Sequence, residues 1–266
     1  MTTLSLPSRQ IMTILARVGF ATRGLIYLLI GGFATGAAFR SNQSPQGFTG
    51  AAQAVLHKPF GSLVVVGIVI GLGCFVGWLA VEAVIHGSRR REPRHWLLAI
   101  GRFGDALLYA GFMFLLLGLL LGRRAGGEHG LHSWVAWLFS SPGGRWLVGL
   151  VGIGLFCAGI GLVVWAWAGN VAAPLDLAPK EKRMTNPVSR YGVSGRGVAL
   201  ALIGFYLVSA AFDANPAEAH ELGGLLQHLR HTAYGWIILL LFALSFGASA
   251  FFDFLAAFYR HIEAPA

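Results

Sequence analysis

The chain has 266 residues, of which 56% are hydrophobic and 12% are charged, whereas soluble domains are roughly 25% charged. So few charges cannot cover a water-facing surface, which excludes an ordinary soluble protein. The net charge of +9 does not indicate nucleic acid binding, because the basic residues lie in short loops between apolar segments. There they face lipid headgroups. We therefore expect the lipid bilayer as the partner, with anionic lipids on the cytoplasmic side, and no nucleic acid.

Apolar segments long enough to cross a bilayer occur repeatedly along the chain. At about 1.5 Å per residue, roughly 20 residues cross a hydrocarbon core of about 30 Å. The first predicted span is too long for a signal-peptide core and is therefore interpreted as a signal anchor. Arg196 interrupts the fifth. In chain order the six predicted spans are residues 17–39, 61–85, 97–121, 145–168, 191–212 and 234–258.

The orientation follows from the distribution of lysine and arginine, which are retained on the cytoplasmic side during insertion. The amino terminus, the loops after the second and fourth spans, and the carboxyl terminus hold most of the 20 basic residues. Both termini are therefore expected in the cytoplasm. The strongest basic clusters are Arg89, Arg90, Arg91 and Arg94, followed by Lys180, Lys182, Arg183 and Arg190.

The spans that run outward share a sequence motif. Residues 16–24 read ARVGFATRG and residues 189–197 read SRYGVSGRG, with two arginines six residues apart and a glycine after each. Residues 101–104, GRFG, repeat the first half only, and Leu108 stands where the second arginine would be. A repeat of this kind shapes the whole fold assignment.

The spans that return inward open with a second motif, in which a proline or an aromatic residue precedes a glycine. Its three copies are HKPFG at 57–61, SSPGG at 140–144 and HTAYG at 231–235. Aligning them makes Cys74 and Cys157 equivalent, with Ala248 in the third copy. Both cysteines lie in apolar runs, so they predict no disulfide framework.

These two motifs resemble the bacterial membrane proteins that carry tandem copies of the domain of unknown function 1206, and the resemblance covers nearly the whole chain. It implies a bacterial inner-membrane location and repeated helix pairs. It implies no established activity, so no catalytic residue is carried over.

We expect an all-α integral membrane bundle, residues 1–266 forming one membrane domain of six transmembrane helices. The three two-helix repeats cover residues 16–85, 97–168 and 189–258. Repeats in one orientation predict a pseudo-threefold axis along the membrane normal.

Charged residues at the cytoplasmic level of the bundle form the main candidate site. Glu82 and Asp253 lie near the ends of returning helices, three positions apart in the repeat alignment, which places them on one helical face. Asp105, one turn after Arg102, can pair within its own helix. The eight residues of this predicted charge ring are Arg17, Arg23, Glu82, Arg102, Asp105, Arg190, Arg196 and Asp253.

Two interpretations of the charge ring stay open. In the functional one, its excess positive charge forms a cytoplasmic gate or an anion-binding mouth, because intramembrane ionisable residues commonly mark function. In the structural one, Arg17 and Arg190 extend to the headgroups while the other residues pair between helices.

Histidines on the outer side suggest a weaker hypothesis, a periplasmic metal site or pH sensor. His129 with His132, and His228 with His231, are spaced three residues apart, which can place two ligands on one helix face. Ordinary polar loop histidines are the alternative. No histidine is central in a span, which argues against a haem held inside the bundle. The nearby acidic residues are Glu128, Glu218 and Glu221.

The outer connections, residues 47–58, 129–140 and 217–230, mix apolar and polar residues. They predict short helices in the membrane interface, with Trp134 and Trp137 at headgroup depth. Such helices either cap a central cavity or dock a partner, or they only seal the bundle.

Glycine pairs with a spacing of four predict close helix crossings. They are Gly32 with Gly36, Gly67 with Gly71, Gly73 with Gly77, and Gly118 with Gly122.

The sequence contains no phosphate loop, no zinc-protease helix, no nucleophile elbow and no paired carboxylates within a span. We therefore expect neither an enzyme nor a cofactor, but a non-catalytic membrane scaffold or accessory protein. The alternative is a small-solute or ion channel or carrier that uses the charge ring. A centre packed with Phe, Leu and Gly favours the scaffold, whereas a polar cavity lined by Arg23, Arg196, Glu82 or Asp253 favours transport.

Overall fold

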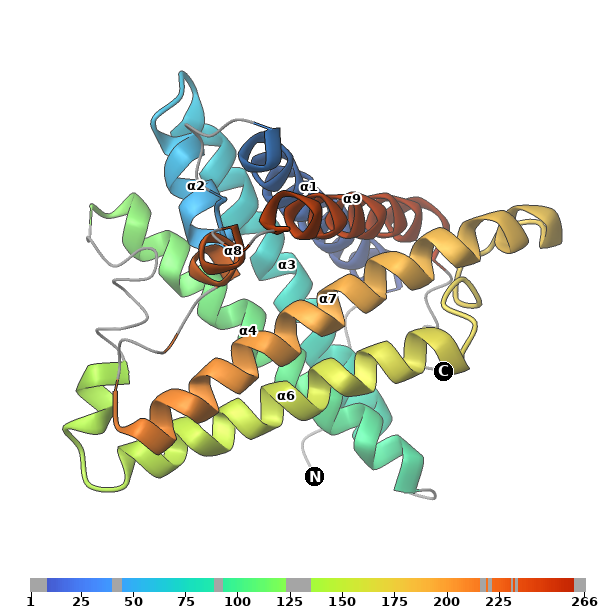
Figure 1. Cartoon of the computed structure of the whole chain (residues 1–266). Helices are drawn as coiled ribbons and strands as arrows, with labels where there is room; N and C mark the ends of the chain where they lie inside the picture. The colour runs from blue at the N-terminus through green and yellow to red at the C-terminus, as the bar shows by residue number, and fades with distance from the viewer. Residues whose placement is uncertain are drawn as a thin grey trace.

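The computed structural model describes residues 9–39, 45–88, 93–122, 135–215, 219, 222–230, 232 and 234–260. Within these residues the named elements are all helices (Figure 1). In chain order they are α1 (Arg9–Phe39), α2 (Phe48–Leu56), α3 (Gly61–Ser88), α4 (Pro93–Leu120), α6 (Gly144–Ala168), α7 (Pro179–Asp213), α8 (Leu222–Arg230) and α9 (Gly235–Tyr259).

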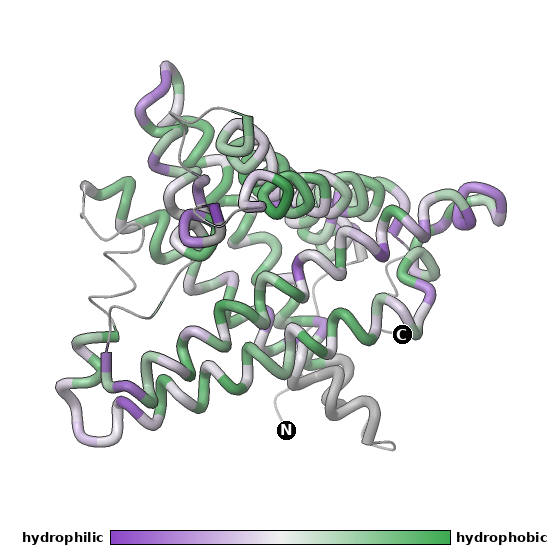
Figure 2. The backbone as a smooth tube through the Cα atoms, in the orientation of Figure 1, coloured by the Kyte–Doolittle hydropathy of each residue, from purple (hydrophilic) through white to green (hydrophobic). Residues whose placement is uncertain are grey.

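The six long helices α1, α3, α4, α6, α7 and α9 are each long and apolar enough to cross a membrane. Hydrophobic residues run along these helices, while hydrophilic residues gather toward their ends and in the connections (Figure 2). The predicted all-α bundle of six transmembrane helices is confirmed. The chain is a multi-pass membrane protein.

Two helices begin well before the predicted spans. α1 begins at Arg9 rather than at residue 17, and α7 begins at Pro179 rather than at residue 191. Pro179 suits a first helical turn, and the backbone N–H of Ala178 donates to Glu181 Oε2 at 3.1 Å, which caps the start of α7. The start of α7 is largely polar, so apolarity misses it, whereas residues 9–16 at the start of α1 read RQIMTILA and continue the apolar run.

The six long helices form a ring that is incomplete at one position. The second helix of each repeat packs along the first helix of the next, as α3 on α4, α6 on α7, and α9 on α1. Within repeats, α1 packs on α3 and α7 packs on α9, but α4 and α6 form no comparable interface within the described residues. The pseudo-threefold arrangement is therefore closed at five of its six interfaces, and α4 and α6 border the open one.

Glycines spaced seven residues apart bring α6 and α7 together. A Cβ at Gly152 would lie 2.9 Å from the Gly204 carbonyl oxygen, and one at Gly197 would lie 2.7 Å from that of Gly159. Backbones this close leave no room for a side chain at these positions. Glycine allows the two backbones to make direct van der Waals contact.

The same positions are small in the α1–α9 interface. A Cβ at Gly24 would lie 3.3 Å from the Ala250 carbonyl oxygen, and one at Gly31 would lie 3.1 Å from that of Ala243. The predicted spacing of four behaves differently, because a Cβ at Gly32, for example, would meet nothing within 4 Å. Among the predicted glycines spaced by four, Gly71 does make a close contact, with Thr22 of α1, but a Cβ at Gly67, Gly77 or Gly118 would also meet nothing within 4 Å.

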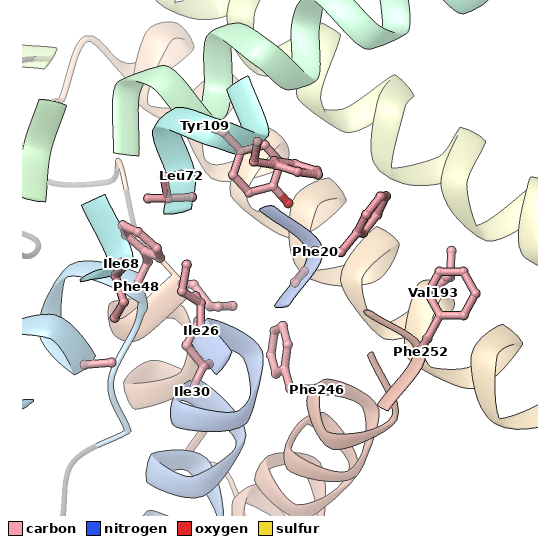
Figure 3. Packing of buried hydrophobic residues seen from close by; sticks show 14 of the residues in the cluster. Phe20, Ile26, Ile30, Phe48, Ile68, Leu72, Tyr109, Val193, Phe246 and Phe252 are labelled. Carbon is pink, nitrogen blue, oxygen red and sulfur yellow. The ribbon is translucent and has the colours of Figure 1, made fainter. Parts of the chain in front are cut away.

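Large apolar side chains fill the interior on the α1 side of the bundle. Phe20, Phe75 and Phe246 are fully buried, and Phe20, Tyr109 and Phe246 point toward one shared interior from α1, α4 and α9 (Figure 3). Phe75 meets Tyr109 edge to face with ring centroids 5.0 Å apart. Aromatic packing thus surrounds the charged residues described below.

Short helices occupy the outer connections, at Phe48–Leu56, 135–139 and Leu222–Arg230. Leu225 and Leu226 of α8 are fully buried, so α8 packs onto the bundle, mainly against α9. Trp137 is 62% exposed, while Trp134 lies outside the described residues.

The motif that precedes α3 and α6 makes a tight turn, whereas its equivalent before α9 has ordinary backbone at Tyr234, with φ of −112°. Phe60 and Gly143 hold equivalent positions and both have left-handed backbone conformations, with φ of 63° and 81°. The following Gly61 and Gly144 must be small, because a Cβ at Gly144 would lie 2.6 Å from the Leu138 carbonyl carbon. The glycine therefore lets the chain turn directly from a short outer helix into the next span.

Candidate functional site

The first charged cluster joins three helices through Asp253. Arg23 of α1 donates from Nε to Asp253 Oδ2 at 2.8 Å and from Nη2 to Oδ1, so the pair is bidentate. Arg196 of α7 approaches the same carboxylate, with Nη1 4.0 Å from Oδ1. Asp253 is fully buried and Arg23 is 7% exposed. We call these three residues the Asp253 triad.

Aromatic rings solvate the guanidinium groups of this triad. The guanidinium carbon of Arg23 lies 5.0 Å from the Phe20 ring centroid and 4.8 Å from that of Phe75. That of Arg196 lies 4.9 Å from the centroid of Tyr27, whose hydroxyl is 3.0 Å from the Tyr109 hydroxyl. Cation–π contact of this kind partly replaces water around a desolvated cation.

A second charged cluster forms around Glu82. Arg102 Nε of α4 lies 3.3 Å from Glu82 Oε2, and Arg260 Nη2, just after α9, donates to Glu82 Oε1 at 3.5 Å. Arg260 also lies 4.8 Å from the ring centroids of Phe20 and Trp78. We call Arg102, Glu82 and Arg260 the Glu82 triad.

Arg260 is a member of the site that the sequence did not reveal. It follows the last apolar residue of α9, and its equivalents in the other repeats are His86 and Gly169, so no repeat pattern marks it. Burial lowers the pKa of Arg260, Glu82 opposes that shift and the neighbouring Arg102 and Arg23 add to it, so that the pKa falls from its ordinary value to about 10. The group is therefore still charged at neutral pH.

Three members of the predicted ring lie apart from the triads. Arg17 is exposed and makes no ion pair within the described part of the chain. Arg190 donates from Nη2 to the Gly169 carbonyl oxygen at 2.9 Å, which fastens α7 to the end of α6. Asp105 is exposed and does not pair with Arg102 in the described residues, because Arg102 turns toward Glu82.

The two triads have the same composition, two guanidinium groups to one carboxylate. Positive charge is thus left over in a part of the protein that water reaches poorly. Because Arg23 takes both oxygens of Asp253, Arg196 is the less well satisfied cation. Chemically, the arrangement can hold helices together, and it can also attract an anion.

The loop between α6 and α7 packs against the end of the bundle at which α9 ends. Val171, Ala172 and Leu175 are fully buried in it. The Asp176 N–H donates to the Tyr259 carbonyl oxygen at 2.7 Å, and Leu175 forms a backbone bridge with Arg260. This loop therefore holds the residue that completes the Glu82 triad.

Two serines, one on α7 and one on α9, have buried hydroxyls. The hydroxyls of Ser189 and Ser249 are buried and make no hydrogen bond within the described residues. Ser249 lies one turn before Asp253 on α9. Gly192 of α7 lies against the Ser249 backbone, so Ser249 places a buried hydroxyl in the α7–α9 contact beside the Asp253 triad.

The described residues contain no group of three His, Cys, Asp or Glu side chains that could hold a metal ion. His228 is exposed. The remaining residues of the metal hypothesis lie outside the described residues: Glu128, His129, His132, Glu218, Glu221 and His231.

Comparison with known proteins agrees with the threefold repetition of these helices. The family described as Domain of Unknown Function (DUF1206) matches the chain three times in tandem, over residues 18–86, 100–169 and 191–260. The chain belongs to this family. Arg260 is the last residue of the third DUF1206 match, so Glu82, Arg102 and Arg260 each lie in a different one of the three matches.

A relative of similar length comes from a bacterium. The chain is 27% identical over 253 residues to the uncharacterized protein YxxB of Bacillus subtilis (strain 168), an alignment that covers 92% of this chain and 90% of that protein. No solved structure matches the chain.

Proposed function

We propose that the chain is a non-catalytic scaffold or accessory protein of a bacterial inner membrane. The observation that carries this proposal is the use of the charged residues. The Asp253 triad ties together α1, α7 and α9, and the Glu82 triad ties α3 and α4 to the end of α9. Five of the six long helices are thus fastened by charge pairs at one level.

The chemistry of the triads also argues for a structural role. Arginine does not release its proton in ordinary proteins, so four of the six groups are unsuited to acid–base catalysis. Asp253 is fully buried and engaged by Arg23 through both oxygens. A catalytic carboxylate needs access to a substrate, which this geometry does not provide.

The proposed orientation places the triads toward the cytoplasm, with the outward helices starting there. Lys180, Lys182 and Arg183 lie in the first turns of α7, which extend beyond its apolar part. Basic residues at this position attract anionic lipids of the inner leaflet.

A small-anion channel or carrier is the second candidate function. It is favoured by one observation, the surplus of guanidinium groups over carboxylates in the two triads. Among the described residues, Arg196 is held by a 4.0 Å contact to Asp253 and by the Tyr27 ring.

Flux measurements on purified protein in lipid vesicles separate the two functions. For a scaffold, chloride, phosphate and proton fluxes should match those of protein-free vesicles. Arg196→Leu is the matched variant, because it removes the less well satisfied cation. Flux through the wild-type protein that Arg196→Leu abolishes would refute the scaffold and establish the second candidate.

A further inference from the structure

The open position between α4 and α6 has residues that suit a closed interface. In the first repeat, a Cβ at Gly19 would lie 2.8 Å from the Phe75 Cα, so α1 and α3 touch there. In the third, one at Gly192 would lie 2.6 Å from the Ser249 backbone nitrogen. The repeat alignment places Gly104 of α4 opposite Ala158 of α6 at this point. Both are small enough for the same close approach.

A second set of equivalent positions also has residues that suit a closed α4–α6 interface. Thr22 of α1 fits against Gly71 of α3, and Gly195 of α7 fits against Ser245 of α9. Each pair matches a side chain with a glycine. The equivalent pair in the middle repeat is Leu107 and Gly154, again a side chain and a glycine.

In the structure these middle-repeat residues do not meet. A Cβ at Gly104 or Gly154 would find nothing within 4 Å, and Leu107 is 66% exposed. Ala158 is exposed as well. The complementarity of a helix interface is thus present in the sequence while the interface itself is open.

Asp105 adds an electrostatic reason for closure. Its equivalents Phe20 and Val193 are 1% and 3% exposed, whereas Asp105 is exposed and unpaired within the described residues. Asp105 lies within electrostatic range of Tyr109, and Tyr109 lies within range of Arg196. Asp105, one turn from Tyr109 on α4, and Arg196 of α7 thus both act electrostatically on Tyr109.

We propose that the α4–α6 interface closes in a second conformation, in which Gly104 packs on Ala158 and Asp105 becomes buried beside Arg196. The structure described here is the open conformation. Closure completes the ring and supplies a third carboxylate to the surplus guanidinium groups. This conformational change is independent of whether the protein acts as a scaffold or moves an anion.

Disulfide crosslinking tests the closure directly. In a Cys74→Ala/Cys157→Ala background, Gly104→Cys with Ala158→Cys should form a disulfide in oxidised membranes, because a closed interface brings the Cα atoms within about 7 Å. The matched control is Phe103→Cys with Ile160→Cys, which lies at similar depth on other faces of the two helices. It should not crosslink. No crosslink at 104 and 158, with both thiols reactive toward maleimide, would overturn the proposal.

A distance measurement covers the case in which the crosslinking variant does not fold. Spin labels at the exposed positions Phe114→Cys and Leu150→Cys, in the same cysteine-free background, should give two distance populations in lipid. A single long distance would overturn the closure.

The role of Asp105 has its own variant. Asp105→Asn should lower the crosslinking yield of the 104 and 158 pair about tenfold, because the closed form loses an ion pair. Asp176→Asn, at an exposed acid in the loop after α6, should leave the yield unchanged. An unchanged yield in Asp105→Asn would overturn the pairing with Arg196.

Discussion

At the level of single residues, the charge on Asp253 depends on Arg23. A fully buried carboxylate is strongly unfavourable unless it is paired and hydrogen-bonded, and Arg23 supplies two hydrogen bonds together with its charge. Arg23 depends on its surroundings in turn, since Phe20 and Phe75 cover its guanidinium group. Removing one partner therefore leaves the other in an unfavourable state.

Arg23→Leu should lower the free energy of unfolding by about 3–5 kcal/mol, because it leaves Asp253 buried and unpaired. Asp253→Leu should have a similar effect, and the double variant should lose much less than the sum of the two. Denaturant titration of detergent-solubilised protein provides the measurement. Arg17→Leu, at an exposed position, should change stability by less than about 0.5 kcal/mol. Additive losses in the double-mutant cycle would rule out direct coupling.

At the level of elements, close helix contacts depend on small residues spaced seven apart. In α1, α6, α7 and α9 these positions hold Gly or Ala. The equivalent positions of the α3–α4 interface hold Val69, Val76, Tyr109 and Leu116. Side chains rather than backbones thus form the α3–α4 interface. The hydroxyl of Tyr109 in this interface also hydrogen-bonds with that of Tyr27 on α1.

Gly152→Ala should destabilise the protein by about 1–3 kcal/mol, because the added methyl group would lie 2.9 Å from the Gly204 carbonyl oxygen and force α6 from α7. Gly161→Ala is the matched control on the same helix, where a Cβ meets nothing within 4 Å. It should be neutral or stabilising by about 0.5–1 kcal/mol, since alanine favours the helix. Thermal unfolding in detergent distinguishes them, and equal effects would show that the crossing tolerates a methyl group.

The helices were predictable from the sequence because lipid imposes a long apolar run on every span. Arg23, Arg196 and Asp253 were predictable candidates because they interrupt such runs. Their partners were not predictable, since the pairing of Arg23 with Asp253 depends on α1 lying beside α9, the two ends of the chain. Arg260 was not predicted because it lies after the last apolar run and interrupts none. The predicted pairing of Asp105 with Arg102 is absent among the described residues because Arg102 turns toward Glu82.

At the level of the whole molecule, the order of the ring explains how the repeats cooperate. Contacts between repeats are made at all three boundaries, and the contact of α9 with α1 links the last repeat to the first. No repeat forms a separate bundle, so a DUF1206 unit of two helices finds most of its partners in neighbouring units. The charged triads follow the same rule, because each combines residues from different repeats.

The proposed orientation predicts which loops face the cytoplasm, and α6 offers a sharp test because exposed loop residues lie on both sides of it. In a Cys74→Ala/Cys157→Ala background, Ser141→Cys before α6 should react with an impermeant maleimide in intact cells. Asp176→Cys after α6 should react only once the membrane is permeabilised. Labelling of Asp176→Cys alone in intact cells would reverse the orientation and place the triads outside. Labelling of both from outside would mean that α6 does not cross the membrane. We do not expect this, because α6 has 25 mostly apolar residues, enough to cross a bilayer, and exposing them to water is energetically unfavourable.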